Sequence, residues 1–508
     1  MSTPPYIELH AHSAFSFLDG ASTPLELAKA GGELGYRAMA LTDHDGLWGS
    51  MEFAHCARDH GLRPITGTEL TLHVDGPKTR HIGKFSAHQP GGLVHLTLLV
   101  EDEVGYRNLC RLLTAAHSHT RDNAARVAEP AWTTPAEVER HAEGLVCLSG
   151  CARDGALAGA FERGDTALGE RLGRRLLAAF GRDRFRVELQ RPYWRHDRAR
   201  NRWLALLAER LGVPTVATGN VHAHARSRSH VQDALVAIGL GETLESSEPL
   251  RRGNSTSALA SPAAMAARFA EHPDAVAETL RLGERLRFDL TTDLGYRYPQ
   301  EEDADGKLAR LCRGRLAENY RDGGRRRGAE QRLEPELATI RKLGLSAFFL
   351  LHHRLLELAR DVACEVRGKD AARSLLPPGR GRGSSVSSIV CYLTGLSHID
   401  PVEAGLFAGR FLNDEIVPDS PRSMPDIDLD FPRDIREALI PRVHEVYGAD
   451  RSALVAAFPT YRPRGVVRDF GKALGLPPEE IEKVAGVVGF HGSVEEMERD
   501  VAAALGDR

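Results

Sequence analysis

The chain has 508 residues, of which 42% are hydrophobic and 27% charged, with a formal net charge of −4. This length suggests two to four domains, and the charge excludes a global basic signature for nucleic acid, so a polyanion site would need local arginine clusters. Seven scattered cysteines argue against a disulfide framework, and no signal peptide or apolar run of about 18 residues is seen, so we expect a cytoplasmic protein without a membrane partner.

The first half of the sequence predicts alternating strands and helices. Residues 6–12 (YIELHAH) predict a short strand, residues 23–35 a helix that opens with Thr-Pro, and residues 36–45 a second strand. A helix over 51–61 and a strand over 63–72 continue this order. Further strand-like runs lie at 95–100, 144–150, 185–190 and 213–222. The βαβα order predicts an α/β domain.

Potential metal ligands recur at one kind of position, the carboxyl end of a predicted strand. They are His10, His12, His44, Glu69, Cys151 and His222. Ligand-binding groups gather at such ends in α/β folds and barrels. Imidazole, carboxylate and thiolate together suit Zn, Mn or Fe, and such a cluster can activate water for phosphate-ester hydrolysis. We interpret the other nearby histidines as surface or core residues, namely residues 55, 60, 73, 81 and 88.

The second half predicts mainly helices. An alanine-rich helical region over 229–287 is followed by a linker over 290–303. Helical stretches follow over 308–320 and 333–344, then a Pro/Gly-rich segment over 375–388 and a charged helical tail over 433–508.

An acidic strand precedes the tail. SMPDIDLDFPRD places Asp426, Asp428 and Asp430 at every second position, between large apolar residues. In a strand these carboxylates share one face, roughly 6.5–7 Å apart, and two of them would repel by roughly 2.5 kcal/mol at an effective dielectric of about 20. A divalent cation such as Mg²⁺ reverses that repulsion. The alternative is an edge strand with a solvated acidic face.

A glycine-rich loop lies upstream of these acids, in PPGRGRGSSVSSIVCYLTG. Such a run is by default a flexible linker. Here it enters an apolar helix-like segment, which would present backbone N–H groups and a positive dipole end to a phosphate, beside Arg380 and Arg382. Together with the acidic strand it fits nucleotidyl transfer with two Mg²⁺ ions.

The segments LHAHSAFSFLDGAS, LTDHDGLWG and PITGTEL resemble the PHP phosphoesterase domain at the start of bacterial C-family DNA polymerases. The resemblance implies a distorted (β/α) barrel that binds Zn²⁺ or Mn²⁺ through His10, His12, Asp19, His44, Glu69, His95, Cys151 and His222, with Asp43 as a neighbouring acid. Proofreading members carry Asp where this chain has Asn220, and an amide holds a divalent ion more weakly. We therefore expect partial metal binding and doubt a 3′–5′ exonuclease.

The glycine-rich loop and MPDIDLDF, in this order, are similar to the palm of C-family polymerases of the polymerase III alpha type. This implies that Asp428 and Asp430 are catalytic, supported by Asp426. It also implies that Gly383 and Ser384, beside Arg382, contact the nucleotide phosphates.

The later segment TYRPRGVVRDFGKALGLPPEEIEKVA resembles the error-prone, translesion branch of this family. Its Arg462, Arg464 and Lys472 are candidates for DNA contact, and the alternative for each is a solvated helix face.

We therefore expect a PHP domain over 1–285, an α+β nucleotidyltransferase-like palm over 286–450 and the start of a helical thumb over 451–508. The expected function is error-prone DNA synthesis in damage tolerance, acting on a primer-template and dNTPs. A sliding clamp and mutasome proteins would bind through regions outside this chain. The alternatives are a metal-dependent phosphoesterase or 3′–5′ exonuclease, and a non-catalytic mutasome module.

The resemblance places the third catalytic aspartate beyond residue 508. We therefore expect this chain to be a fragment or a truncated product. It would bind metal and some nucleotide, but we do not expect it to extend a primer alone.

Overall fold

The computed structural model divides into two compact units. The first comprises Met1–Leu294 with Thr460–Arg508, and the second comprises Gly295–Pro459. The structure describes residues 5–74, 92–120, 129–295, 299–321, 323–371, 379–407, 409, 411–412, 427–448, 451–455, 457, 460–488 and 493–505.

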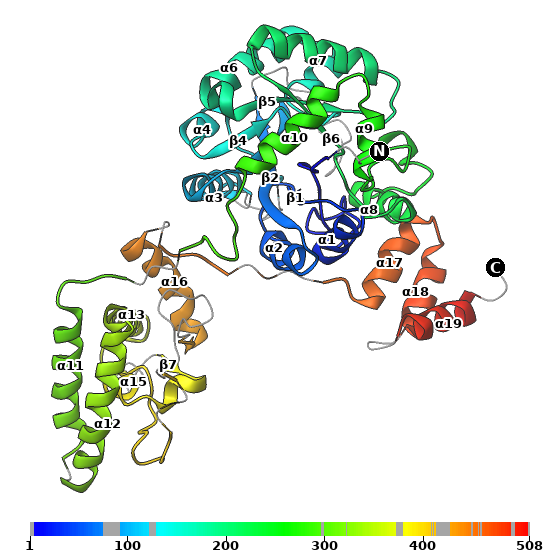
Figure 1. Ribbon diagram of the computed structural model, residues 1–508. Coiled ribbons are helices and arrows are strands. Elements are labelled where there is room, and N and C mark those ends of the chain that lie inside the picture. The colour runs from blue at the N-terminus through cyan, green and yellow to red at the C-terminus, as the bar shows by residue number, and fades with distance from the viewer. Residues whose placement is uncertain are drawn as a thin grey trace. The chain divides into compact units, whose positions relative to one another are not determined.

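The first unit is built on a curled six-stranded sheet in the order β1 to β6 (Figure 1). Its strands are β1 (Ala38–Leu41), β2 (Arg63–His73), β3 (Leu93–Val100), β4 (Leu145–Leu148), β5 (Phe185–Gln190) and β6 (Thr215–Thr218). Strand β3 is antiparallel to β2 and β4, and the other neighbours are parallel. The sheet confirms the predicted α/β class.

The expected strand over 6–12 forms isolated bridges instead of a continuous ladder. Glu8 pairs with Met39 of β1, and Ala11 pairs with Val221, just after β6. The His12 amide donates to the Val221 carbonyl at 2.7 Å. Because this segment joins the two edge strands, it closes the sheet into a distorted barrel and brings the H-x-H motif beside the end of β6.

Helices pack around the sheet. They are α1 (Pro24–Glu33), α2 (Ser50–Asp59), α3 (Glu103–His117), α4 (Pro135–Arg140), α5 (Ala158–Glu162), α6 (Thr166–Arg184), α7 (Asp197–Leu211), α8 (Ser229–Leu240), α9 (Pro262–Arg268) and α10 (Pro273–Arg285), with short 3₁₀ turns η1 (Arg226–Arg228) and η2 (Glu248–Leu250). The Thr-Pro start of α1 forms a capping box between Thr23 and Glu26. Strand β1 is buried on both faces, since Met39 and Ala40 belong to different apolar clusters, which explains its continuous apolar run.

The C-terminal helices α17 (Pro463–Ala473), α18 (Pro478–Val487) and α19 (Val494–Leu505) pack within the first unit. Helix α17 contacts α8 (Figure 1), and the Leu244 amide, just after α8, donates to the Ala473 carbonyl at 2.7 Å. These helices agree with the predicted helical tail.

The second unit is mainly helical. Its described elements are α11 (Ala304–Asn319), α12 (Gly323–Lys342), α13 (Ser346–Arg367), β7 (Arg380–Gly381), η3 (Gly383–Ser387), α15 (Ile389–Thr394), β8 (Leu429–Asp430) and α16 (Arg433–Tyr447). The acidic strand is thus short, and it pairs antiparallel with β7. Ile427, Leu429 and Phe431 pack on the apolar core, as their alternation predicts.

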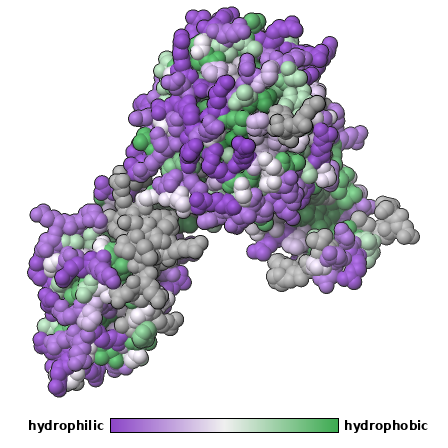
Figure 2. All heavy atoms as spheres, viewed as in Figure 1, coloured by the Kyte–Doolittle hydropathy of each residue, from purple (hydrophilic) through white to green (hydrophobic). Residues whose placement is uncertain are grey.

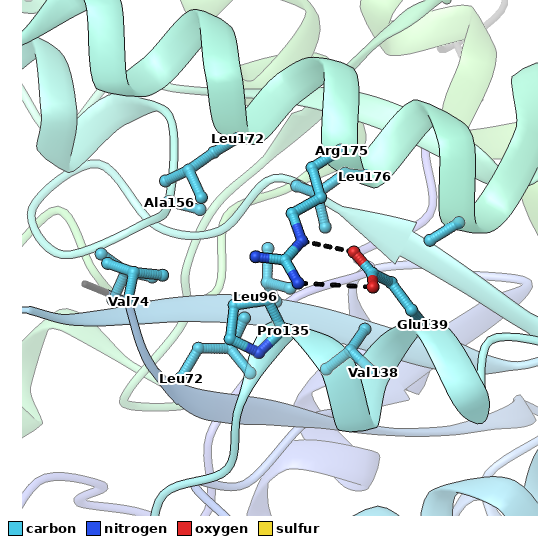
Figure 3. A pocket seen from close by; sticks show the side chains of 12 residues that line it. Leu72, Val74, Leu96, Pro135, Val138, Glu139, Ala156, Leu172, Arg175 and Leu176 are labelled. Carbon is cyan, nitrogen blue, oxygen red and sulfur yellow. Dashed lines mark hydrogen bonds and ion pairs between the residues drawn. The ribbon is translucent and has the colours of Figure 1, made fainter.

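The face in Figure 2 is predominantly hydrophilic. None of the described helices combines the length and the apolar character that crossing a membrane requires. A small apolar crevice beside α4 and α6 is lined by Leu72, Leu96 and Leu176 and bordered by the Arg175–Glu139 ion pair (Figure 3). Its lining residues include none of the predicted ligands.

The start of α15 depends on Glu336 of α12. The Ile389 amide donates to Glu336 Oε2 at 3.1 Å and the Val390 amide to Oε1 at 3.4 Å. The Ser388 hydroxyl also donates to this carboxylate. Glu336 therefore satisfies helix N–H groups that would otherwise lack a partner.

We expect Glu336→Ala to destabilise α15 by about 1–3 kcal/mol, because several donors lose their acceptor. Hydrogen exchange of the amides in Ile389–Thr394 should then accelerate roughly 5- to 150-fold. Glu334→Ala is the matched control on the same helix, since it removes only an exposed ion pair with Arg313. Equal exchange in both variants would contradict the role of Glu336.

Candidate functional site

The barrel surrounds one buried carboxylate, that of Glu69, with four imidazoles. Its Oε1 lies 3.5 Å from His10 Nε2 and 3.5 Å from His95 Nδ1, and its Oε2 lies 3.3 Å from His12 Nε2 and 3.3 Å from His44 Nδ1. Glu69 lies within the long strand β2 and not at its end, contrary to the expectation from sequence. Its position beside His44 comes from a parallel bridge between these two residues.

The remaining predicted ligands lie beside this cluster. Asp19 Oδ2 is 3.3 Å from His44 Nε2 and 3.0 Å from His222 Nε2. Cys151 Sγ is 3.8 Å from His95 Nδ1. The structure therefore brings all eight residues together, and we call this set the candidate metal centre.

Three groups in the described chain have ligand atoms that all lie within 4.8 Å of one another. They are His10, His12 and Glu69; His44, Glu69 and His95; and His12, His44 and His222. His10 Nε2, His12 Nε2 and Glu69 Oε1 are buried and have no hydrogen-bond partner. Buried polar atoms without partners are costly, and nitrogen and oxygen ligands of this kind suit a divalent transition metal. The residues therefore fit a metal ion.

The electrostatics of the centre favour an ionised Glu69. Burial alone would raise the pKa of this carboxyl, but His10, His95 and His44 hold it well below its usual range. Burial, with His222 and His44, holds the pKa of His12 well below its usual range. The His12 imidazole is therefore neutral and can offer its lone pair to a metal.

Two further groups orient these ligands: Glu188, which the sequence analysis did not mark, and Asp43, which it named as a neighbouring acid. Buried Glu188 of β5 accepts a hydrogen bond from the Nδ1–H group of His10 at 2.7 Å. The other ring nitrogen of His10, Nε2, then faces Glu69. The Asp43 carboxylate accepts bonds from the hydroxyls of Ser13 and Ser16, each at 2.7 Å. Asp43 therefore holds the loop after the H-x-H motif.

Backbone strain also collects here. Leu18, Asp45 and Asn220 have φ values of 66°, 47° and 46°. Leu18 immediately precedes Asp19, Asp45 immediately follows His44, and Asn220 lies two residues before His222. Aspartate and asparagine adopt the left-handed region at modest cost, so the strain falls mainly on Leu18, and such strain is concentrated at functional sites.

A second candidate site lies in the second unit, where Arg382 meets both predicted catalytic acids. Its Nε is 3.5 Å from Asp428 Oδ2 and 3.6 Å from Asp430 Oδ1, and its amide donates to the Asp428 carbonyl at 3.2 Å. Gly383 and Ser384 follow directly in η3 and are exposed. The two acids therefore point to the same side, next to the Gly-Ser turn. Asp426 lies outside the described residues.

The helix after this turn differs from the expectation. Its first amides are bonded by Glu336 and by the Ser388 side chain, so a phosphate would have to displace these partners. Within the described loop, Gly383 and Ser384 at the start of η3 are exposed, whereas Ser385 and Ser387 are buried.

Arg462, Arg464 and Lys472 are exposed and lie at the start and near the end of α17. The structure does not separate DNA contact from a solvated helix face for these three residues. Their DNA-binding role therefore stays a prediction.

Comparisons with known proteins match two regions of the chain. Residues 8–192 match the PHP domain family, and residues 306–504 match the bacterial DNA polymerase III alpha NTPase domain family. Among solved structures, an amidohydrolase from Chromobacterium violaceum is similar at 19% identity over 43% of this chain and 87% of its own, with a TM-score of 0.31.

Curated relatives named error-prone DNA polymerase match nearly the whole chain. The protein of Symbiobacterium thermophilum is 34% identical over 97% of this chain and 43% of its own length. The protein of Mycolicibacterium paratuberculosis is 37% identical over 93% of this chain and 41% of its own length. The protein of Pseudomonas paraeruginosa is 34% identical over 95% of this chain and 42% of its own length. The chain thus spans less than half the length of these relatives.

The chain therefore combines a PHP domain with a DNA polymerase III alpha domain. Nearly its whole length is similar to a part, less than half, of proteins named error-prone DNA polymerase. This confirms the resemblance inferred from the sequence.

We expect Glu188→Gln to weaken divalent metal binding by about 10- to 100-fold, because His10 loses the carboxylate that orients its ring and raises its basicity. Competition with a chromogenic chelator for Mn²⁺ or Zn²⁺ measures this affinity. Glu209→Gln changes the same group on the exposed face of α7 and should bind as the wild type does. Equal affinities in all three proteins would refute the orienting role of Glu188.

Proposed function

We propose that this chain provides the PHP and palm parts of an error-prone DNA polymerase that synthesises DNA across damage. The observation that carries the proposal is the shared contact of Asp428 and Asp430 with Arg382, beside the Gly-Ser turn. The match over 306–504 and the polymerase relatives support it. The substrates would be a primer-template and dNTPs in the cytoplasm.

In this proposal Asp428 and Asp430 hold Mg²⁺, with Asp426 as a supporting acid. When bound, Mg²⁺ would activate the attacking 3′-hydroxyl and stabilise the leaving pyrophosphate. Arg382 offsets the repulsion between the two acids in the metal-free protein. Gly383 and Ser384 would contact the triphosphate at the exposed start of η3.

We also propose roles for the other predicted parts. The eight residues of the candidate metal centre would bind Zn²⁺ or Mn²⁺, and Arg462, Arg464 and Lys472 would contact DNA phosphates. The PHP domain would span 1–285, the palm 286–450 and the start of the thumb 451–508. A sliding clamp and mutasome proteins would bind outside this chain.

A second candidate function is hydrolysis of phosphate esters or DNA 3′ ends by the candidate metal centre. It is favoured by the buried, unpaired ligand atoms of His10, His12 and Glu69. His12, neutral by its lowered pKa, and ionised Glu69 would hold the metal that activates water. His44 and Asp19 are partly exposed, at 27% and 24% of their side chains, so a substrate could approach from their side.

We expect Asp428→Asn and Asp430→Asn each to weaken Mg²⁺-dependent dNTP binding by about 10- to 100-fold, because a charged ligand is lost. Calorimetric titration of dATP with and without Mg²⁺ measures this. Asp434→Asn is the matched control, since Asp434 is a nearby exposed acid that pairs with Arg367.

Equal effects of all three substitutions would contradict the polymerase assignment. His10→Ala tests the second candidate in the same preparations. It should abolish Mn²⁺-dependent release of nucleotide from DNA 3′ ends and leave dNTP binding unchanged. Release that survives His10→Ala would exclude the candidate metal centre as its source.

A further inference from the structure

An arginine that the sequence did not mark enters the candidate metal centre. Arg252 Nη2 lies 3.1 Å from both carboxylate oxygens of Asp19 and 2.5 Å from His222 Nε2. Its side chain is only 16% exposed. The guanidinium thus bridges two residues that are expected to bind metal.

The contact with His222 uses the lone pair that a metal would need. His222 Nδ1 lies 2.9 Å from the Asn220 carbonyl oxygen and donates its proton there. This tautomer leaves Nε2 as an acceptor, and Nε2 faces Arg252, which can only donate. Arg252 therefore occupies the coordination position of His222.

The charges at this end also disfavour a second cation. Arg252 already neutralises the Asp19 carboxylate, with two contacts from one nitrogen. The nearby Asn220 side chain adds only a neutral amide, whose buried Oδ1 has no hydrogen-bond partner. By contrast, at the Glu69 end His10 Nε2, His12 Nε2 and Glu69 Oε1 are buried without a hydrogen-bond partner.

The backbone around Arg252 is held in place. Trp194 Nε1 donates to the Arg252 carbonyl at 3.2 Å. Arg153 donates to the carbonyls of Leu250 and Arg251 at 3.1 and 3.3 Å, and its guanidinium lies 5.0 Å from the Trp194 ring centroid. These contacts hold the backbone that places Arg252 beside the centre.

We propose that Arg252 acts as a built-in cation at the Asp19–His222 end of the centre, so that this protein binds divalent metal only at the Glu69 end. The inference rests on the proposed metal centre. By this inference Arg252 lowers the number of metal ions that the centre binds.

Metal content tests this proposal. The wild type and Arg252→Met, which keeps a long side chain without the charge, are stripped with chelator, loaded with Mn²⁺, desalted and analysed for metal per chain. We expect Arg252→Met to hold one further Mn²⁺ ion, and His222→Ala in that background to lose it. Arg251→Met is the matched control, because Arg251 pairs with Asp233 and should bind as the wild type does.

No gain in Arg252→Met, or an equal gain in Arg251→Met, would overturn the proposal. A wild type that holds no metal would refute metal binding at the Glu69 end, and a gain in Arg252→Met would then support only the blocking role of Arg252. Anomalous diffraction from Mn²⁺-soaked wild-type crystals gives a test that needs no variant. Density at the Glu69 end alone is the expected result, and density between Asp19 and His222 would overturn the proposal.

Discussion

The interaction on which the first unit depends is the enclosure of the Glu69 carboxylate by four imidazoles. Glu69 is 1% exposed, and an isolated buried carboxylate would be far too costly to keep ionised. Its position in β2 requires ring nitrogens from the H-x-H segment, from the loop after β1 and from β3. The bonds that join His10 and His12 to Val221 close the barrel and deliver two of these rings. The same segment therefore closes the barrel and supplies two rings to the candidate metal centre.

The sequence predicted this centre well where strands are parallel. His44 and His222 lie just beyond β1 and β6, so the rule that ligands gather at carboxyl ends located them. His95 escapes that rule because it lies near the start of β3. Since β3 is antiparallel to β2, its first residues reach the same edge, where His95 pairs in register with Thr71. The sequence favoured His95 as a ligand without a strand-end position to explain it, because single-sequence patterns do not reveal strand direction.

Other functional residues could not be predicted from the sequence, because their partners are distant in the chain and no motif marks them. Glu188 sits in FRVELQ, where an alternating polar residue is ordinary for a strand, and its bond to His10 spans 178 positions. Arg252 lies in a loop whose path is set by Trp194 and Arg153. Glu336 is one of several acids on α12, and nothing local shows that it caps α15. Long-range contacts of this kind depend on the folded chain.

Both candidate sites place an arginine on carboxylates, and burial separates their consequences. Arg382 is 63% exposed and its acids are 54% and 51% exposed, so solvent screens these contacts and they contribute little to holding the side chain. Under the proposed function, a Mg²⁺ ion arriving with a nucleotide would displace it, because the phosphates would supply further ligands. Arg252 instead contacts Asp19 and His222 where its side chain is only 16% exposed, and its own carbonyl accepts a hydrogen bond from Trp194. Removing its charge from the centre would leave the Asp19 carboxylate without that partner, which is costly where solvent is scarce. The same pairing of guanidinium and carboxylate is therefore a replaceable counter-charge in one unit and a permanent one in the other.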